Sequence, residues 1–121
     1  MRTLSDHKVN GLNEALTINV IDEPGPGGAN HHYEILLETP TGVRQTNILF
    51  HKGPTQEAGF NGLSNEALMA VVMDRLRGFQ SGELATRENA LALTKLEESM
   101  MWLKKRTLDR VARGVEGTMT K

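Results

Sequence analysis

Three arginines near the end of the chain recur at spacings of four and three residues, a pattern that could bind an anionic ligand. They are Arg106, Arg110 and Arg113, and these spacings place them on one face of a helix. Arginine presents paired N–H donors that match a phosphate group, and Trp102, on the same side, offers a flat surface for a base. The alternative is a solvated face whose arginines pair with nearby acids, including Asp109 of neighbouring chains.

A glycine-rich stretch, DEPGPGGANHHY at residues 22–33, is the second candidate. Its glycines suggest a phosphate-binding loop, but such loops open a helix whose N-terminus meets the anion. Here the stretch leads into strand-like residues, and no Lys-Ser or Lys-Thr pair follows. We therefore expect a mobile loop between two strands, with Asn30, His31 and Tyr33 forming a wall of a ligand pocket.

Three histidines could bind zinc if the strands that carry them lie side by side. A hairpin that closes at residues 40–42 sets residue 31 opposite about residue 51, so that His31 or His32 approaches His51 and Lys52. Adjacent strand residues point to opposite faces, so only one of the first two can join His51, and no third ligand is evident. We predict no metal site and expect cross-strand polar pairs, although ring donors beside a lysine could also receive an anionic or ribose-bearing ligand.

No group of residues typical of catalysis is evident. The chain has no cysteine and no Gly-x-Ser-x-Gly motif, and its carboxylates are scattered singly or along helix surfaces. Covalent catalysis needs a nucleophile beside a base, which this pattern does not supply. We therefore expect a binding protein that is not an enzyme and needs no cofactor.

The hydrophobic period changes at about residue 60, which predicts an α+β fold within a single domain, residues 1–121. Before that point apolar and polar residues alternate, as in strands. The strands are predicted over residues 16–20, 33–38 and 48–51. Thr39-Pro-Thr-Gly42 is a turn sequence that joins the second and third strands into a hairpin. We expect a small antiparallel sheet within residues 10–53.

After residue 60 the pattern predicts a helical hairpin over residues 64–114. Ser64 is a good N-cap, and the first helix should end near Ser81-Gly82, where glycine can adopt a positive φ. Its apolar positions are Leu68, Val71, Val72, Leu76 and Phe79. Thr86 is the next N-cap candidate, and the second helix could run to Gly114. Its inner stripe is predicted to contain Asn89, Leu93, Leu96, Met100 and Leu103.

The second helix is predicted to be longer than the first, which indicates self-association. At about 40 Å it has more apolar stripe than one short partner helix can cover. The chain is also poor in aromatic residues, with three Phe, one Tyr and one Trp. A second copy of the chain could bury the remaining surface, so we expect a homo-oligomer.

Composition and charge set limits on partners and location. The formal net charge is −1, so the chain as a whole offers no electrostatic reason to bind a nucleic-acid polymer or an anionic membrane. No apolar run approaches the roughly 18 residues that span a bilayer, and the N-terminal residues contain no signal-peptide hydrophobic region. The absence of cysteine fits a reducing compartment. We expect a soluble, cytoplasmic protein.

Several segments together resemble a known family. These segments are GLNEALTINVIDEPGPGGANHHYEI, RENALALTKLEESMMWLKKRT and the closing GVEGT. They are similar to the first-described family of Thoeris anti-defence proteins, which are phage-encoded sponges for the cyclic ADP-ribose signals of bacterial TIR-domain immune sensors. The helical hairpin also resembles the domain shared with anti-CBASS sponges, which sequester cyclic oligonucleotides. The resemblance covers roughly residues 9 to 118.

The resemblance implies a fold, an assembly and a set of ligand-binding residues. Members combine a small antiparallel sheet with a helical hairpin, form dimers and hexamers through the hairpins, and bind the intact signal in the host cytoplasm without hydrolysing it. The positions that match the signal pocket are Phe79, Asn89, Arg106 and Arg110. Phe79 would stack an adenine, Asn89 would bind its edge or a ribose, and the two arginines would hold the pyrophosphate. Arg87 is implied in a separate site for a cyclic trinucleotide.

Two other classes of function remain open. One is a nucleic-acid-binding module that uses the stripe of Arg106, Arg110 and Arg113, which the acidic net charge disfavours. The other is an enzyme that cleaves the nucleotide signal. Salt-dependent binding to DNA would support the first, and recovery of unmodified ligand would exclude the second.

Overall fold

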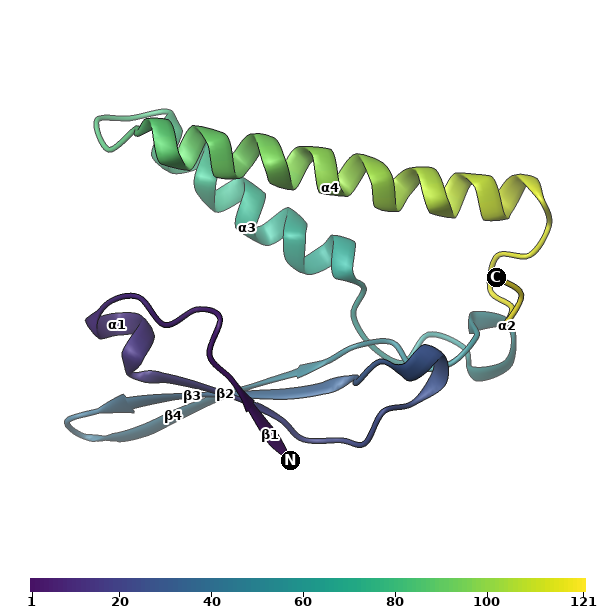
Figure 1. The fold of residues 1–121 in the computed structure, drawn as a ribbon, viewed down its shortest axis with the longest axis horizontal. Coiled ribbons are helices and arrows are strands. Elements are labelled where there is room, and N and C mark those ends of the chain that lie inside the picture. The colour runs from purple at the N-terminus through teal and green to yellow at the C-terminus, as the bar shows by residue number, and fades with distance from the viewer. The chain divides into compact units, whose positions relative to one another are not determined.

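The computed structural model describes all residues, 1–121, and they divide into two compact units. The first unit comprises Met1–Gly53 with Ala58–Leu63, and the second comprises Pro54–Glu57 with Ser64–Lys121. The first contains an antiparallel sheet and the second a helical hairpin (Figure 1). This arrangement confirms the predicted α+β fold class.

The sheet has four antiparallel strands in the order β1-β2-β3-β4. They are β1 (Arg2–Leu4), β2 (Leu16–Val20), β3 (His32–Thr39) and β4 (Gly42–Leu49). The predicted sheet boundary at residue 10 is therefore wrong, because β1 lies before it. A strand of three residues is too short to show a period of two, so the alternation pattern could not reveal it.

The hairpin between β3 and β4 closes where the turn sequence predicts, with Thr39 paired to Gly42. The same register pairs His32 with Leu49, and the carbonyl of His31 accepts a hydrogen bond from the Phe50 N–H at 2.8 Å. Residue 31 thus lies opposite residue 50, one position from the predicted partner at 51. A shift of one residue exchanges the faces of a strand, so it changes which side chains can meet.

Two short α-helices were not predicted: α1 (Gly11–Glu14) lies between β1 and β2, and α2 (Thr55–Ala58) lies between β4 and the first long helix. In α1, the Asn10 side chain caps the first turn by accepting a hydrogen bond from the Asn13 N–H at 3.0 Å. Helices of four residues carry no readable apolar period, so only the capping residue at position 10 could have indicated one of them.

The most deeply buried residues of the sheet lie on β2. Val20 is only 1% exposed, and the neighbouring Asn19 is buried with its amide paired on both sides. Its Oδ1 accepts a hydrogen bond from Thr3 at 2.9 Å and its Nδ2 donates to Glu34 at 3.3 Å. These bonds offset the cost of burying a polar side chain, so β1, β2 and β3 are tied together by side chains as well as by the main chain.

The first long helix, α3 (Asn65–Gln80), begins and ends where the sequence predicts. The Ser64 hydroxyl accepts a hydrogen bond from the Ala67 N–H at 3.1 Å. The predicted reason for the end is wrong, because Gly82 does not adopt a positive φ. The junction is instead closed by Gln80, whose side-chain amide donates to the carbonyl of Thr86 and accepts from its N–H, both at 3.0 Å.

The second long helix, α4 (Arg87–Ala112), has 26 residues and exceeds α3, which has 16. Thr86 caps it as predicted, accepting a hydrogen bond from the Asn89 N–H at 3.1 Å. It ends just before Gly114, which has a φ of 72°. Figure 1 shows α4 continuing past α3 at its C-terminal end, which confirms that the first helix covers only part of the second.

The inner face of the hairpin is predicted correctly for α4 and only in part for α3. Met100 is buried on α4, and Leu93, Leu96 and Leu103 are partly buried. On α3 the buried residue is Met73, whereas the predicted Val71, Val72 and Phe79 remain exposed. Apolar residues on α3 extend beyond one face, so their spacing alone cannot identify the side that meets α4.

Neither helix is long and apolar enough to cross a membrane.

Candidate ligand-binding site

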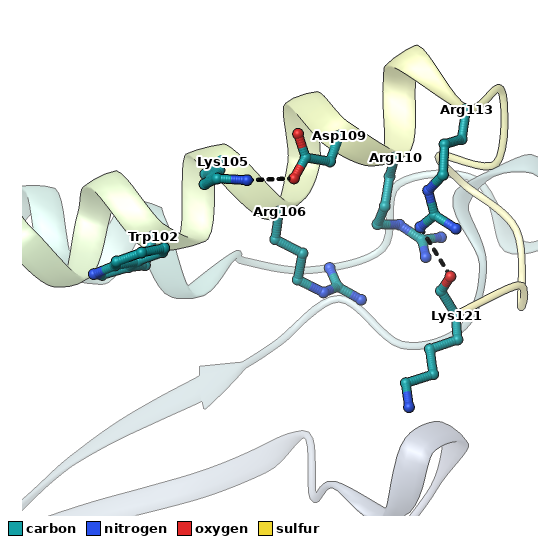
Figure 2. Close-up of a pocket in the computed structure, with 7 residues that line it drawn as sticks. All are labelled: Trp102, Lys105, Arg106, Asp109, Arg110, Arg113 and Lys121. Carbon is teal, nitrogen blue, oxygen red and sulfur yellow. Dashed lines mark hydrogen bonds and ion pairs between the residues drawn. The ribbon is translucent and has the colours of Figure 1, made fainter.

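A pocket lies beside the C-terminal half of α4, within the second unit. It has a volume of about 460 Å³. Its lining is mainly cationic and includes one aromatic ring (Figure 2): Trp102, Lys105, Arg106, Asp109, Arg110, Arg113 and Lys121. The structure therefore gathers the predicted arginine stripe and Trp102 around one cavity, which is suited to an anion with an attached ring.

Arg106 is the arginine of this pocket whose guanidinium has no partner within the chain. Its side chain is exposed and extends into the open space beside the helix, as Figure 2 shows. The nearest carboxylate in the lining, Asp109, pairs with Lys105 at 2.8 Å instead. All five N–H donors of Arg106 are thus free for a ligand.

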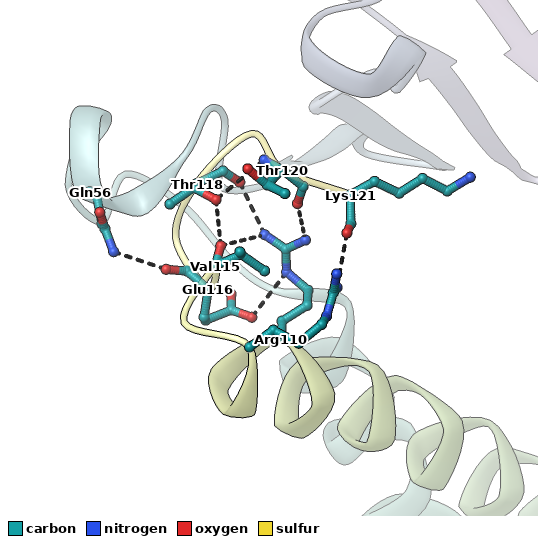
Figure 3. Close-up of polar contacts among 8 residues, drawn as sticks. Gln56, Arg110, Val115, Glu116, Thr118, Thr120 and Lys121 are labelled. Atoms are coloured by element: carbon teal, nitrogen blue, oxygen red, sulfur yellow. Dashed lines mark hydrogen bonds and ion pairs between the residues drawn. The ribbon is translucent and has the colours of Figure 1, made fainter.

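Arg110, by contrast, is buried and hydrogen-bonded within the chain. Its side chain is only 5% exposed, and its Nε donates to the Glu116 carboxylate at 3.2 Å. The remaining bonds run to main-chain oxygens of the residues that follow the helix (Figure 3): Val115 at 2.9 Å, Thr118 at 3.0 Å and Thr120. The alternative reading, in which these arginines pair with acids, therefore describes Arg110, with Glu116 as the acid. Sequence patterns missed this because the acceptors are mostly main-chain atoms.

The other predicted ligand residues lie at the junction end of the hairpin. Phe79 is 36% exposed, and the guanidinium of Arg75 lies over its ring at 5.1 Å from the centroid. Asn89 is half-buried in the first turn of α4. Arg87 is exposed at the start of the same helix and forms no hydrogen bond or ion pair. An aromatic face, an amide and a free cation are thus available at this end.

The two groups of residues are too far apart to share one small ligand within a chain. Asn89 and Arg106 both belong to α4, and 17 residues separate them, which corresponds to about 26 Å along a helix axis. The predicted set of Phe79, Asn89, Arg106 and Arg110 can therefore surround one ligand only if another copy of the chain supplies one of the two groups.

The glycine-rich loop is closed by its own hydrogen bonds. The carboxylate of Asp22 accepts hydrogen bonds from the main-chain N–H groups of His31 at 3.0 Å and His32 at 3.1 Å. The Asn30 amide donates to the carbonyl of Asp22 at 2.7 Å and accepts from Arg2 at 2.8 Å. Partial desolvation opposes the shift, but these N–H groups together lower the pKa of Asp22 below its ordinary value of 3.8.

The other candidates near this loop are only partly paired: Nδ1 of His31 is buried without a hydrogen bond and lies 3.9 Å from the Asp22 carboxylate, whereas His32, His51 and Tyr33 have partners within the first unit. Nε2 of His32 lies 3.1 Å from Oδ1 of Asn47, which is the expected kind of cross-strand polar pair. His51 donates from Nε2 to the carbonyl of Gly53 at 2.6 Å and accepts the Asn61 N–H at Nδ1. Tyr33 packs edge-to-face on Phe50 with 5.7 Å between ring centroids. The structure brings together no group of three His, Asp or Glu side chains that could hold a metal ion.

Comparison with known families identifies the group to which this chain is related. Residues 43–108, more than half of the chain, match the family model described as Acb2/Tad1, hairpin domain. The chain belongs to the Acb2/Tad1 hairpin-domain family. It is also 57% identical over 74 residues to a protein named Thoeris anti-defense 1 from Bacillus phage SBSphiJ7. These findings confirm the resemblance to Thoeris anti-defence proteins.

The extent of these matches matters for the site. The aligned residues are 61% of this chain and 52% of the phage relative, so the match spans about half the length of that relative. The Acb2/Tad1 hairpin match runs from β4 into α4 and ends at residue 108. It therefore includes Phe79, Asn89 and Arg106 but stops before Arg110 and the residues that surround its guanidinium.

Proposed function

We propose that this protein is a phage anti-defence sponge, which binds cyclic ADP-ribose immune signals in the cytoplasm of the infected cell and sequesters them without degrading them. The glycocyclic ADP-ribose isomers are the proposed ligands. Membership of the Acb2/Tad1 hairpin family supports the anti-defence role, and so does the similarity to the phage protein named Thoeris anti-defense 1.

The observation that carries the proposal is the unpaired guanidinium of Arg106 in a cationic pocket beside Trp102. A cyclic ADP-ribose combines a pyrophosphate, two riboses and an adenine. Arg106 can donate two parallel hydrogen bonds to a phosphate, while an aromatic face can stack on the base. The free donors have no other assigned partner, so an anionic ligand would satisfy them.

The proposed site is shared between two copies of the chain. Arg106 of one copy would hold the pyrophosphate, while Phe79 and Asn89 of the other would stack the adenine and bind its edge. Two hairpins that cross in opposite directions would bring these groups together. In each hairpin, Phe79 and Asn89 lie at the junction end of α4 and Arg106 lies near its other end. Large apolar side chains on the hairpin support such an assembly: Trp102 is 58% exposed and Leu108 is 67% exposed. We propose a homo-oligomer, a dimer or a hexamer, on this basis.

A second ligand is proposed for Arg87. This arginine is exposed and unpaired at the first turn of α4, where the positive end of the helix dipole also favours an anion. A cyclic trinucleotide presents three phosphates, so it could contact the Arg87 side chains of several copies around a symmetry axis. Loss of trinucleotide binding in an Arg87→Ala protein, with cyclic ADP-ribose binding retained, would support this second site.

The Arg106→Ala protein tests the proposal directly. A charge-assisted hydrogen bond contributes about 1.5–3 kcal/mol, so the affinity for glycocyclic ADP-ribose should fall about ten- to hundredfold in calorimetric titration. The melting temperature should change little, since the exposed Arg106 side chain forms no hydrogen bond or ion pair within the chain. Arg44→Ala is the matched control, because Arg44 is also exposed and unpaired but lies on β4. Equal affinities for all three proteins would reject the proposal for this pocket.

A further inference from the structure

The residues after α4 form an ordered segment that docks on α2, and neither the family match nor the proposed function gives it a role. We call Val115–Lys121 the C-terminal segment. The Gln56 N–H donates to the carbonyl of Gly117 at 3.0 Å. The Gln56 side chain donates to the carbonyl of Glu116, also at 3.0 Å (Figure 3). Two bonds to one residue fix the position of the segment relative to α2.

Gly117 makes this docking possible. It is buried and has a φ of 80°, a conformation that favours glycine. A Cβ atom at this position would lie 2.5 Å from Oγ1 of Thr55, which is closer than real side-chain contacts. Both the backbone conformation and the space thus require glycine, so the GVEGT sequence at residues 114–118 has a local structural cause.

The docked segment uses up the hydrogen-bonding capacity of Arg110. A guanidinium has five N–H donors, and four of them are taken by Glu116 and by the main-chain oxygens of Val115, Thr118 and Thr120. The one remaining donor cannot form a paired contact with a phosphate. Nearby, Arg113 donates one bond to the main-chain oxygen of Lys121 at 2.9 Å. Arg106 alone keeps every donor free.

We propose that the C-terminal segment is a positioning element of the ligand site: through Glu116 it holds Arg110 as a fixed wall of the pocket and leaves Arg106 to contact the anion. This inference rests on the proposed function. Arg110 is then a positioning residue that sets the shape and the potential of the cavity. Because Arg110 is already held by Glu116 and by main-chain oxygens, this part of the pocket wall does not have to be reorganised when the ligand enters.

The Glu116→Gln substitution separates this role from direct contact, because the two predict opposite changes in affinity. If Arg110 is a fixed wall, loss of the charged partner loosens its guanidinium, which must then be ordered when the ligand binds. The affinity for glycocyclic ADP-ribose should therefore fall about three- to tenfold, the cost of immobilising one long side chain. If Arg110 instead binds the ligand, the Glu116 carboxylate competes with the phosphate, and its removal should raise the affinity.

Asp109→Asn is the matched control for charge. Asp109 lines the same pocket but pairs with Lys105, so this variant removes one negative charge without touching Arg110. It also frees the Lys105 ammonium in the same pocket, so we expect its affinity for the anionic ligand to rise. The inference would be overturned if the affinity of the Glu116→Gln protein rose as much as that of the Asp109→Asn protein, or more. Unchanged affinity with a lower melting temperature would also overturn it, since the segment would then only stabilise the fold.

Gln56→Ala provides a milder second variant, which decides the question if Glu116→Gln does not fold. It removes the side-chain bond to the carbonyl of Glu116. The loosened segment must then be ordered on binding, so the affinity should fall about threefold, and unchanged affinity would count against the inference. Binding by the wild-type protein and its loss in Arg106→Ala test the proposed function itself. If these succeed and the Glu116→Gln and Gln56→Ala results fail, only the positioning role is wrong.

Discussion

The glycine-rich loop at residues 22–33 and the C-terminal half of α4 differ in how their polar side chains are used. The loop looks like a binding motif in the sequence, with glycines followed by Asn30, His31 and His32. In the structure most of these groups are paired: Asp22 accepts the main-chain N–H groups of both histidines, Asn30 is bonded on both sides, and the His32 ring pairs with Asn47. The exception is the His31 ring, whose Nδ1 is buried without a hydrogen bond, 3.9 Å from the Asp22 carboxylate. On α4, Arg106 sits in a regular helix of ordinary composition, yet its guanidinium has no partner.

This difference shows that residue types alone do not locate a binding site. A polar group that is already paired gains little from a ligand, because binding would exchange one hydrogen bond for another. An unpaired guanidinium beside an aromatic ring in a pocket can gain new bonds at no cost to the fold. The loop is therefore expected to influence stability and α4 to influence binding, which the following substitutions can test.

Mixing the Phe79→Ala and Arg106→Ala proteins should give the largest effect, because it should restore high-affinity binding that neither protein has alone. Phe79→Ala and Arg106→Ala should each lose affinity, but a dimer with one chain of each kind retains one intact site if the site is shared between copies. After joint refolding of equal amounts, about a quarter of all sites should regain wild-type affinity in equilibrium dialysis, because half of the random dimers are mixed and each has one of two sites intact. Absence of any high-affinity sites in the mixture would break the shared-site model.

Phe79→Ala should weaken binding by about 1–3 kcal/mol, the range for an aromatic ring that stacks on a base. Its stability should change less than that of a core variant, because Phe79 is partly exposed. Met73→Ala is the comparison, since Met73 is buried on the same helix and its truncation should lower the free energy of unfolding by about 2–5 kcal/mol. Equal losses of stability in the two proteins would indicate that Phe79 serves only the core.

Asp22→Asn should have the smallest effect, on stability and not on affinity. The pKa of Asp22 is lowered in the folded state, so its contribution is fully present above the unfolded value of 3.8 and is lost as the pH falls through the folded value. Thermal melts of both proteins should therefore differ at pH 7 and converge below pH 3.8. A difference that grows on acidification would contradict this assignment, and a large loss of ligand affinity would place the loop in the site.

Long periodic elements could be predicted from the sequence because their signals are local. The N-caps Ser64 and Thr86 and the turn at Thr39–Gly42 lie where the structure has them. By contrast, β1 was missed because three residues show no period. The inner face of α3 was assigned only in part, since apolar residues surround much of that helix and only packing against α4 selects Met73 over Val72.

For the candidate site, the sequence predicted the arginine stripe but not which of its guanidinium groups are already hydrogen-bonded within the chain. Arg106 and Arg110 are one helical turn apart and look equivalent in the sequence. The structure distinguishes them because main-chain oxygens of Val115, Thr118 and Thr120 reach one guanidinium and not the other. Main-chain acceptors carry no side-chain signature, so this distinction depends on the path of the C-terminal segment, which follows from the docking of Gly117 beside Thr55.

Retention of an intact cyclic ADP-ribose by the protein can be measured in one experiment. The protein is incubated with glycocyclic ADP-ribose, freed of unbound ligand by filtration and denatured by heat, and the released molecule is identified by mass spectrometry. We expect the wild-type protein to release the unmodified cyclic ligand and the Arg106→Ala protein to retain much less of it. Release of linear ADP-ribose or adenine, or equal retention by both proteins, would contradict the account.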